Sequence, residues 1–83
     1  MKKIIWVPAF VIGGKFILFL NRNYETRYNN NFDKSLYFFN KDEAESVVVM
    51  LKLISGDDYR VYEVEVEEGQ EDDRQNWKMC NEN

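Results

Sequence analysis

The sequence contains no histidine and only one cysteine among its 83 residues, and these shortages limit its chemistry. Histidine is the usual general base near neutral pH and a common zinc ligand. Without it, neither a Ser-His-Asp triad nor a Cys-His pair can form. The carboxylates could perform acid–base work, but they are numerous and clustered, which is more typical of a solvated surface. We therefore predict a protein that is not an enzyme, with no catalytic residues, no metal site and no cofactor.

The single cysteine, Cys80, also excludes an intrachain disulfide. Small secreted domains usually depend on several disulfides, so we predict a cytoplasmic protein. The composition, with 45% hydrophobic and 16% aromatic residues, is that of a globular chain. A chain of this length buries only about 60% of its unfolded surface. The sequence therefore predicts one domain, residues 1–83, whose small core depends on large aromatic side chains.

A long uninterrupted apolar run is missing as well. The most apolar stretch, residues 4–20, is divided by Gly13-Gly14 and by Lys15. This interruption makes the stretch a poor membrane span, and no convincing cleavage site follows its first half. We expect it to be part of the folded structure and not a targeting sequence, and we expect no association with a membrane.

The glycine pair predicts a β-hairpin, because glycine permits the positive φ angles of a tight two-residue turn. The expected strands are Lys3–Ile12 and Lys15–Asn21. Pro8 cannot donate a hydrogen bond to a neighbouring strand, so we expect the first strand to lie at an edge or to contain a bulge. Residues 16–20 are apolar on both alternating faces, which predicts that the second strand is central.

The clearest predicted element is a helix from Asn40 to Ser55. Asn is a good N-cap residue, and Gly56 suits the left-handed position that follows a helix. Apolar residues recur at helical spacing, and we predict that they pack firmly onto the sheet. This apolar face comprises Ala44, Val47, Val48, Leu51 and Ile54, and it is widened by Val49 and Leu53.

Two further strands are predicted, a short one over residues 36–39 and a longer one over residues 59–67, where apolar and acidic residues alternate. The expected fold is α+β: a small antiparallel sheet of three or four strands with one helix on one face, in the order ββ(β)αβ. Residues 68–83 have two alternatives. They form a flexible acidic tail, or they fold back at Trp77 and Met79 as a short strand or helical turn.

The charge is divided unevenly along the chain. Residues 1–41 carry seven Lys or Arg and two Asp or Glu, whereas residues 42–83 carry four and thirteen. The overall charge of −4 therefore hides a positive first half and a strongly negative second half. A negative block of this kind either stays solvated or meets a basic partner.

Nine acidic residues between positions 57 and 73 are the candidate partner-binding surface. Three of them alternate along the predicted fourth strand and would project from its open face about 6.5–7 Å apart, comparable with the phosphate spacing of a nucleic-acid strand. The alternative is that they only keep the protein soluble and protect the strand from edge pairing. The nine are Asp57, Asp58, Glu63, Glu65, Glu67, Glu68, Glu71, Asp72 and Asp73.

The loop between residues 22 and 37 offers a second candidate, because it interleaves basic and aromatic side chains. That mixture suits stacking on single-stranded bases while phosphates are bound. The alternative is that the aromatic rings complete a small core. The candidate nucleic-acid-binding residues are Arg22, Tyr24, Arg27, Tyr28 and Lys34.

In general plan the chain resembles small acidic proteins encoded by phages and other mobile elements, among them anti-CRISPR proteins and other inhibitors of host defence. The resemblance lies in the Gly13-Gly14 hairpin, the helix Asn40–Ser55 and the acidic stretch Tyr59–Asp73. It implies a stoichiometric inhibitor acting in the cytoplasm of a host cell. It carries over no functional residues.

The function that these patterns favour is a non-enzymatic inhibitor that binds a basic partner, such as a nucleic-acid-handling host complex, through its acidic C-terminal surface. The alternative is a small module that binds single-stranded nucleic acid with the loop 22–37. A free sheet edge would also allow two copies to pair as a homodimer.

Overall fold

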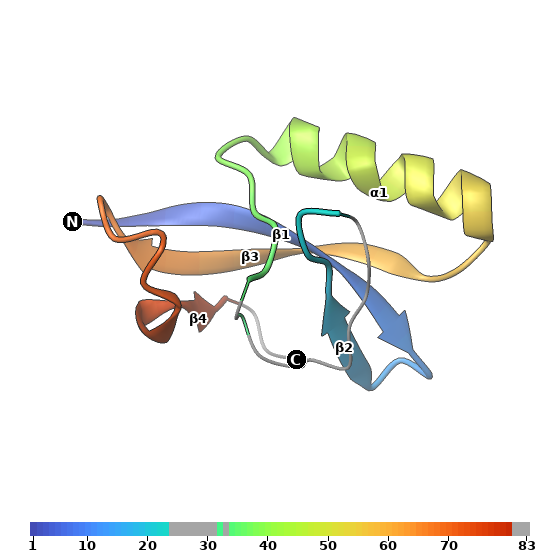
Figure 1. The fold of residues 1–83 in the computed structure, drawn as a ribbon, viewed down its shortest axis with the longest axis horizontal. Helices are drawn as coiled ribbons and strands as arrows, with labels where there is room; N and C mark the ends of the chain where they lie inside the picture. The colour runs from blue at the N-terminus through green and yellow to red at the C-terminus, as the bar shows by residue number, and fades with distance from the viewer. Residues whose placement is uncertain (24–31, 33, 81–83) are drawn as a thin grey trace.

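The fold is an antiparallel four-stranded sheet with one long helix on one face (Figure 1). The computed structural model describes residues 1–23, 32 and 34–80. Its strands lie in the order β2-β1-β3-β4, and the element order ββαββ confirms the predicted α+β class. The elements are β1 (Lys2–Ile12), β2 (Phe16–Phe19), α1 (Lys41–Ser55), β3 (Tyr59–Glu67), the 3-10 turn η1 (Arg74–Asn76) and β4 (Lys78–Met79).

The alternation of side chains along β1 and β3 produces the main core. Ile5 pairs with Val64 in the sheet register, and both side chains are fully buried on the same face. Burying an aliphatic side chain of this size stabilises the fold by about 1.5–3 kcal/mol. Phe19 and Trp77 close this core, and the buried residues of α1 do not belong to it. The helix therefore covers the opposite face of β1 and β3.

The helix begins and ends where the sequence predicts. The Asn40 side chain accepts a hydrogen bond from the Asp42 backbone N–H at 2.8 Å, and Gly56 has a φ of 75°. The Gly56 N–H donates to the carbonyl of Lys52 at 2.8 Å, so the last turn is closed in the usual left-handed way. The predicted bounds of the helix are thus confirmed.

Three predictions about the hairpin are wrong. The turn has three residues, 13–15, between the paired Ile12 and Phe16, and not the predicted two. β2 is an edge strand, not a central one, and the Phe16 side chain is 64% exposed. β1 lies inside the sheet although it contains Pro8. The Pro8 nitrogen faces the β2 side of β1, where the Leu20 N–H donates to the Pro8 carbonyl at 3.5 Å and the Leu20 carbonyl accepts instead from the Leu36 N–H at 2.7 Å. Proline costs no hydrogen bond there.

The predicted strand over residues 36–39 is reduced to one isolated bridge. Phe38 and Trp6 exchange two backbone hydrogen bonds of 2.9 Å each. This bridge continues the edge of the sheet beyond β2, next to the N-terminal half of β1. The segment that enters α1 is thereby fixed to the sheet.

The prediction that the whole apolar stripe of α1 packs onto the sheet is wrong. Ala44 and Val48 are buried, but Leu53 and Ile54 are 82% and 76% exposed. Val49, which was expected to widen the packed stripe, is 54% exposed. α1 packs mainly on β1 and β3, through a stripe narrower than the predicted one.

Candidate interaction surfaces

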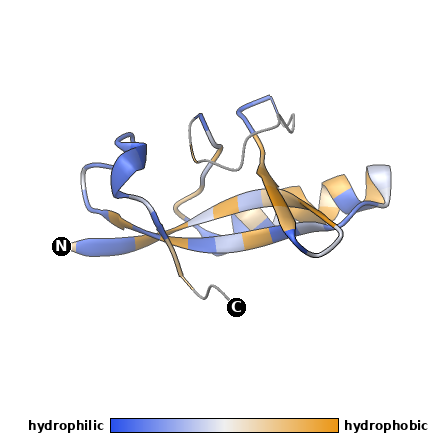
Figure 2. Cartoon of the chain, turned by 90° about the horizontal axis from the view of Figure 1, so that it is seen from below, coloured by the Kyte–Doolittle hydropathy of each residue, from blue (hydrophilic) through white to orange (hydrophobic). Residues whose placement is uncertain are grey.

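The acidic segment, defined as residues 63–73, spans most of β3 and the turn that follows it. This turn and η1 lie beside the N-terminal end of β1, where the strongly hydrophilic residues gather (Figure 2). Two of the predicted acidic residues, Asp57 and Asp58, lie apart, in the connection between α1 and β3. The nine carboxylates therefore form two groups and not one continuous surface.

The carboxylates of β3 face cations from the N-terminus. Lys2 Nζ lies 3.3 Å from the carboxylate of Glu65, and the N-terminal amine lies 3.7 Å from that of Glu67. The side chains of Glu65 and Glu67 are about 40% exposed, so these ion pairs are partly solvated and individually weak. Lys78 of β4 lies opposite Glu65 in the sheet register. The row of Glu63, Glu65 and Glu67 is therefore interrupted by positive charge. It also lies on the same face of β3 as α1, so the prediction that it projects from an open face is wrong.

Glu71 is the most strongly bound carboxylate of the segment. A hydrogen bond from Lys3 Nζ, followed by backbone hydrogen bonds from its own residue and from Gly69, lowers the pKa of Glu71 from 4.5 to about 2. The Gly69 N–H donates at 3.0 Å. Lys3 Nζ also lies 4.4 Å from the centroid of the Phe39 ring. Glu71 thus joins the turn after β3 to the first strand.

Three other acidic residues also have local partners. The Tyr37 hydroxyl donates to Asp72 at 3.2 Å, and burial followed by the Asp72 charge raises the pKa of Tyr37. The Asp73 carboxylate accepts from the Gln75 N–H at 3.3 Å and caps η1. Arg60 donates two hydrogen bonds to Asp58, at 3.1 and 2.8 Å. Each of these carboxylates therefore has at least one partner within the fold.

The remaining carboxylates are those of Asp57, Glu63 and Glu68. Within residues 1–23, 32 and 34–80, no ion pair or side-chain hydrogen bond involves these three side chains. Asp57 and Glu68 are exposed, and Glu63 is half-buried. These three carboxylates of the predicted acidic surface are therefore free to bind a cation of another molecule.

An aromatic cluster around Trp77 packs next to the acidic segment, and the sequence did not predict that its rings come together. Trp77 is buried, and its ring centroid lies 5.1 Å from that of Phe32 and 5.4 Å from that of Tyr37. Its indole N–H donates to the Glu71 carbonyl at 2.9 Å, and the Arg74 guanidinium lies 4.4 Å from its ring centroid. The signal was a lone tryptophan after a run of acids. Residues 74–79 fold back as both a helical turn and a short strand.

The basic loop is described only in part. Tyr24, Arg27 and Tyr28 lie outside the described residues. Arg22 and Lys34 are both exposed and border one open hollow of about 470 Å³. The hollow is lined by Asn21, Arg22, Asn23, Lys34, Asp72 and Arg74. Two of the predicted nucleic-acid-binding residues are thus brought together, with a carboxylate beside them.

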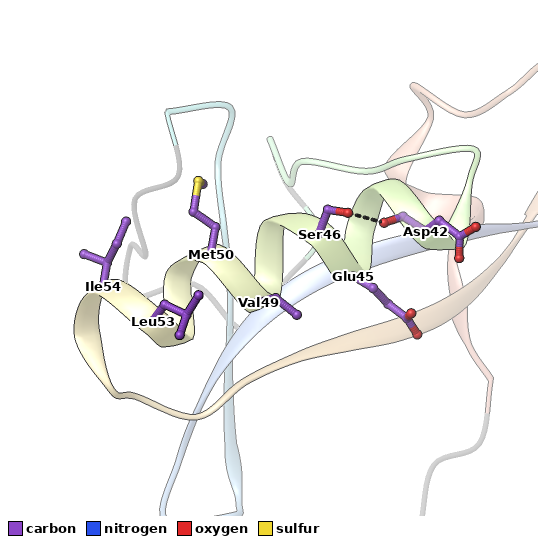
Figure 3. A pocket seen from close by; sticks show the side chains of 7 residues that line it. All are labelled: Asp42, Glu45, Ser46, Val49, Met50, Leu53 and Ile54. Atoms are coloured by element: carbon purple, nitrogen blue, oxygen red, sulfur yellow. Dashed lines mark hydrogen bonds between the residues drawn. The ribbon is translucent and has the colours of Figure 1, made fainter.

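The second surface is the outer face of α1, defined as Asp42, Glu45, Ser46, Val49, Met50, Leu53 and Ile54. Figure 3 shows these side chains along one helix, with the two acids near its start and the apolar residues toward its end. Because all seven belong to one element, the feature is an open surface and not an enclosed cavity. Val49, Leu53 and Ile54 were predicted to pack onto the sheet instead.

Comparison with known protein families, with curated proteins and with solved structures finds no match to this chain. In the part of the chain that the structure describes, no group of three or more Cys, Asp or Glu side chains is placed to hold a metal ion. The described helices include none that is long and apolar enough to cross a membrane.

Proposed function

We propose that the chain is a non-enzymatic inhibitor that binds a basic, nucleic-acid-handling protein. The observation that supports this proposal best is the set of three carboxylates, Asp57, Glu63 and Glu68, that have neither an ion pair nor a side-chain hydrogen bond among the described residues. A negative second half attracts a basic partner over long range and speeds their encounter. Occupation of a basic groove would then exclude nucleic acid from it, so the protein inhibits without a chemical step.

The paired carboxylates have a different role in this proposal. Glu65, Glu67 and Glu71 form ion pairs with the first three residues of the chain, and Glu71 joins the turn after β3 to β1. Replacing them by lysine would set like charges beside Lys2 and Lys3 and would disturb the fold. The unpaired residues are therefore the ones whose charge can be removed with least effect on folding.

The test uses the double variant Glu63→Gln/Glu68→Gln and the control Glu43→Gln, which removes a charge from the exposed first turn of α1. A protein retained from the native host by the immobilised chain would be purified, and its binding to DNA and RNA would be measured by gel shift with increasing amounts of the chain. We expect the wild type and the control to abolish the shift. At low salt, several times more of the double variant should be needed to abolish the shift, because it associates more slowly with a basic partner.

Two results would contradict the proposal. One is a retained protein that binds no nucleic acid, and the other is equal inhibition by the wild type and the double variant at every salt concentration. A charge-driven interaction must also weaken as salt is added, because exposed charges are screened over about 10 Å at 0.1 M.

A second candidate function, binding of single-stranded nucleic acid, is favoured by the hollow that brings Arg22 and Lys34 together. It predicts a salt-dependent gel shift of a labelled single-stranded oligonucleotide by the chain alone. The double variant Arg22→Gln/Lys34→Gln should weaken that shift. The inhibitor proposal predicts no shift in this experiment, so one gel separates the two functions.

A further inference from the structure

The outer face of α1 exposes several large apolar side chains that do not contribute to the core. Leu53 and Ile54 are the most exposed, and Val49 and Met50 lie one turn before them. The residues that attach the helix to the sheet, such as Ala44 and Val48, lie on its other side. Single exposed apolar residues are ordinary, but a continuous stripe on a small protein is typical of a site that contacts another molecule.

Carboxylates lie at both ends of this stripe. Asp42 and Glu45 are at the N-terminal end of α1, and Asp57 follows its C-terminus. Residues 41–60 contain five Asp or Glu and three Lys or Arg, and Arg60 is bound to Asp58. Lys41 lies 3.8 Å from the Glu45 carboxylate on the same helix. The stripe is therefore an apolar surface with carboxylates at both ends and a net negative charge around it.

This charge pattern disfavours a second copy of the chain as the occupant. Antiparallel pairing of two α1 helices would bring Asp42 and Glu45 of one copy toward Asp57 of the other. Parallel pairing would set the acids at the start of each helix beside one another. Like charges that face each other weaken such a contact, whereas lysine and arginine on a partner would complete it.

We propose that the outer face of α1 binds a basic amphipathic helix of a partner protein. Leu53 and Ile54 would contact its apolar side, and Met50, which is flexible and polarisable, adapts to the shape that it meets. The lysine and arginine residues of the partner would lie near Asp42, Glu45 and Asp57. This inference rests on the proposed function in one respect, because it takes the partner to be basic.

The test is a titration of ¹⁵N-labelled protein with two synthetic 18-residue peptides. Both peptides have leucine at helical spacing, and the other positions are lysine in one and glutamate in the other. We expect the lysine peptide to shift backbone resonances along α1 in a saturable way, and the glutamate peptide to bind at least about tenfold more weakly. Equal binding of the two peptides, or no binding of the lysine peptide, would overturn the inference.

Variants locate the site. Leu53→Gln/Ile54→Gln should weaken binding of the lysine peptide at least about tenfold, because truncation of central anchors commonly has such an effect. Phe16→Gln, which removes an exposed ring from β2, is the matched control and should leave binding unchanged. Thermal unfolding of each variant shows that it is folded. Equal loss in the variant and the control would show that the peptide binds exposed apolar surface without specificity, and the inference would be wrong.

The same titration separates this inference from the proposed function. Resonance shifts confined to residues 63–73 would overturn the α1 site and leave the acidic inhibitor proposal intact. Specific binding at α1, together with a captured host protein that binds no nucleic acid, would support the α1 site and overturn the proposed function. Sedimentation of the chain alone measures its oligomeric state. A dimer that dissociates in the Leu53→Gln variant would identify a second copy as the occupant and overturn the proposal.

Discussion

The acidic segment and the outer face of α1 differ in how far the fold itself satisfies their side chains. In the acidic segment, the carboxylates of Glu65, Glu67 and Glu71 have cation partners in the first three residues of the chain. On α1, apolar side chains that could have entered a core remain in solvent. Charge in a sequence therefore does not by itself mark a free surface, and apolarity does not by itself mark a buried one.

The largest effect is expected at Trp77, which attaches the acidic segment to the sheet. Trp77→Ala removes a buried ring, its contacts with Phe32 and Tyr37 and its hydrogen bond to the Glu71 carbonyl. We expect the free energy of unfolding in urea to fall by about 3–5 kcal/mol. Trp77→Phe keeps most of the ring contact and should lie between this variant and the wild type. A loss below about 1 kcal/mol for Trp77→Ala would show that residues 74–79 add little to the fold.

The next effect concerns the Lys3–Glu71 pair and depends on pH. The pKa of Glu71 is lowered from 4.5 to about 2, so its contribution to stability is complete above pH 4.5 and is lost as the pH falls toward 2. The stability of Glu71→Gln relative to the wild type should therefore be lowest near neutral pH and should approach the wild-type value at pH 2. Urea unfolding at pH 7, 4, 3 and 2 measures this. A difference that does not change with pH would contradict the pairing.

Most of the fold is predictable from local pattern. The caps of α1 at Asn40 and Gly56, the place of the hairpin turn and the alternation of β3 are all encoded by neighbouring residues. The position of Pro8 is not, because its tolerance depends on Leu36, which is distant in the sequence and donates to the Leu20 carbonyl opposite Pro8. The edge position of β2 likewise depends on β3 pairing with the other side of β1.

The candidate surfaces are less predictable for the same physical reason. Whether Glu63 or Glu65 keeps a free charge depends on where Lys2 lies, and β-sheet register decides that. Helical periodicity predicts which residues share a face of α1. It does not predict how much of that face the sheet covers, and this decides whether Leu53 is buried. Sequence analysis identified the acidic residues but could not divide them into paired and unpaired groups.

A smaller effect is expected on the reactivity of Cys80, which depends on the negative charges of β3. Burial raises the pKa of the Cys80 thiol, and the charges of Glu65 and Glu63 raise it further. The reactive thiolate is therefore scarcer at pH 7 than in an ordinary cysteine, and reaction with iodoacetamide should be slow. Glu65→Gln should speed the reaction modestly, whereas Glu43→Gln, on the distant helix, should not. A rate like that of free cysteine would contradict the partial burial of the thiol.

The smallest effect on stability is expected on the outer face of α1. Leu53→Gln replaces a side chain that is mostly in solvent by another good helix former, so the free energy of unfolding should change by no more than about 0.5 kcal/mol. Val48→Ala, on the buried side of the same helix, should cost about 1.5–3 kcal/mol. Urea unfolding of both variants measures the contrast. If Leu53→Gln were as destabilising as Val48→Ala, Leu53 would belong to the core, and the outer face of α1 would not be free to bind a partner.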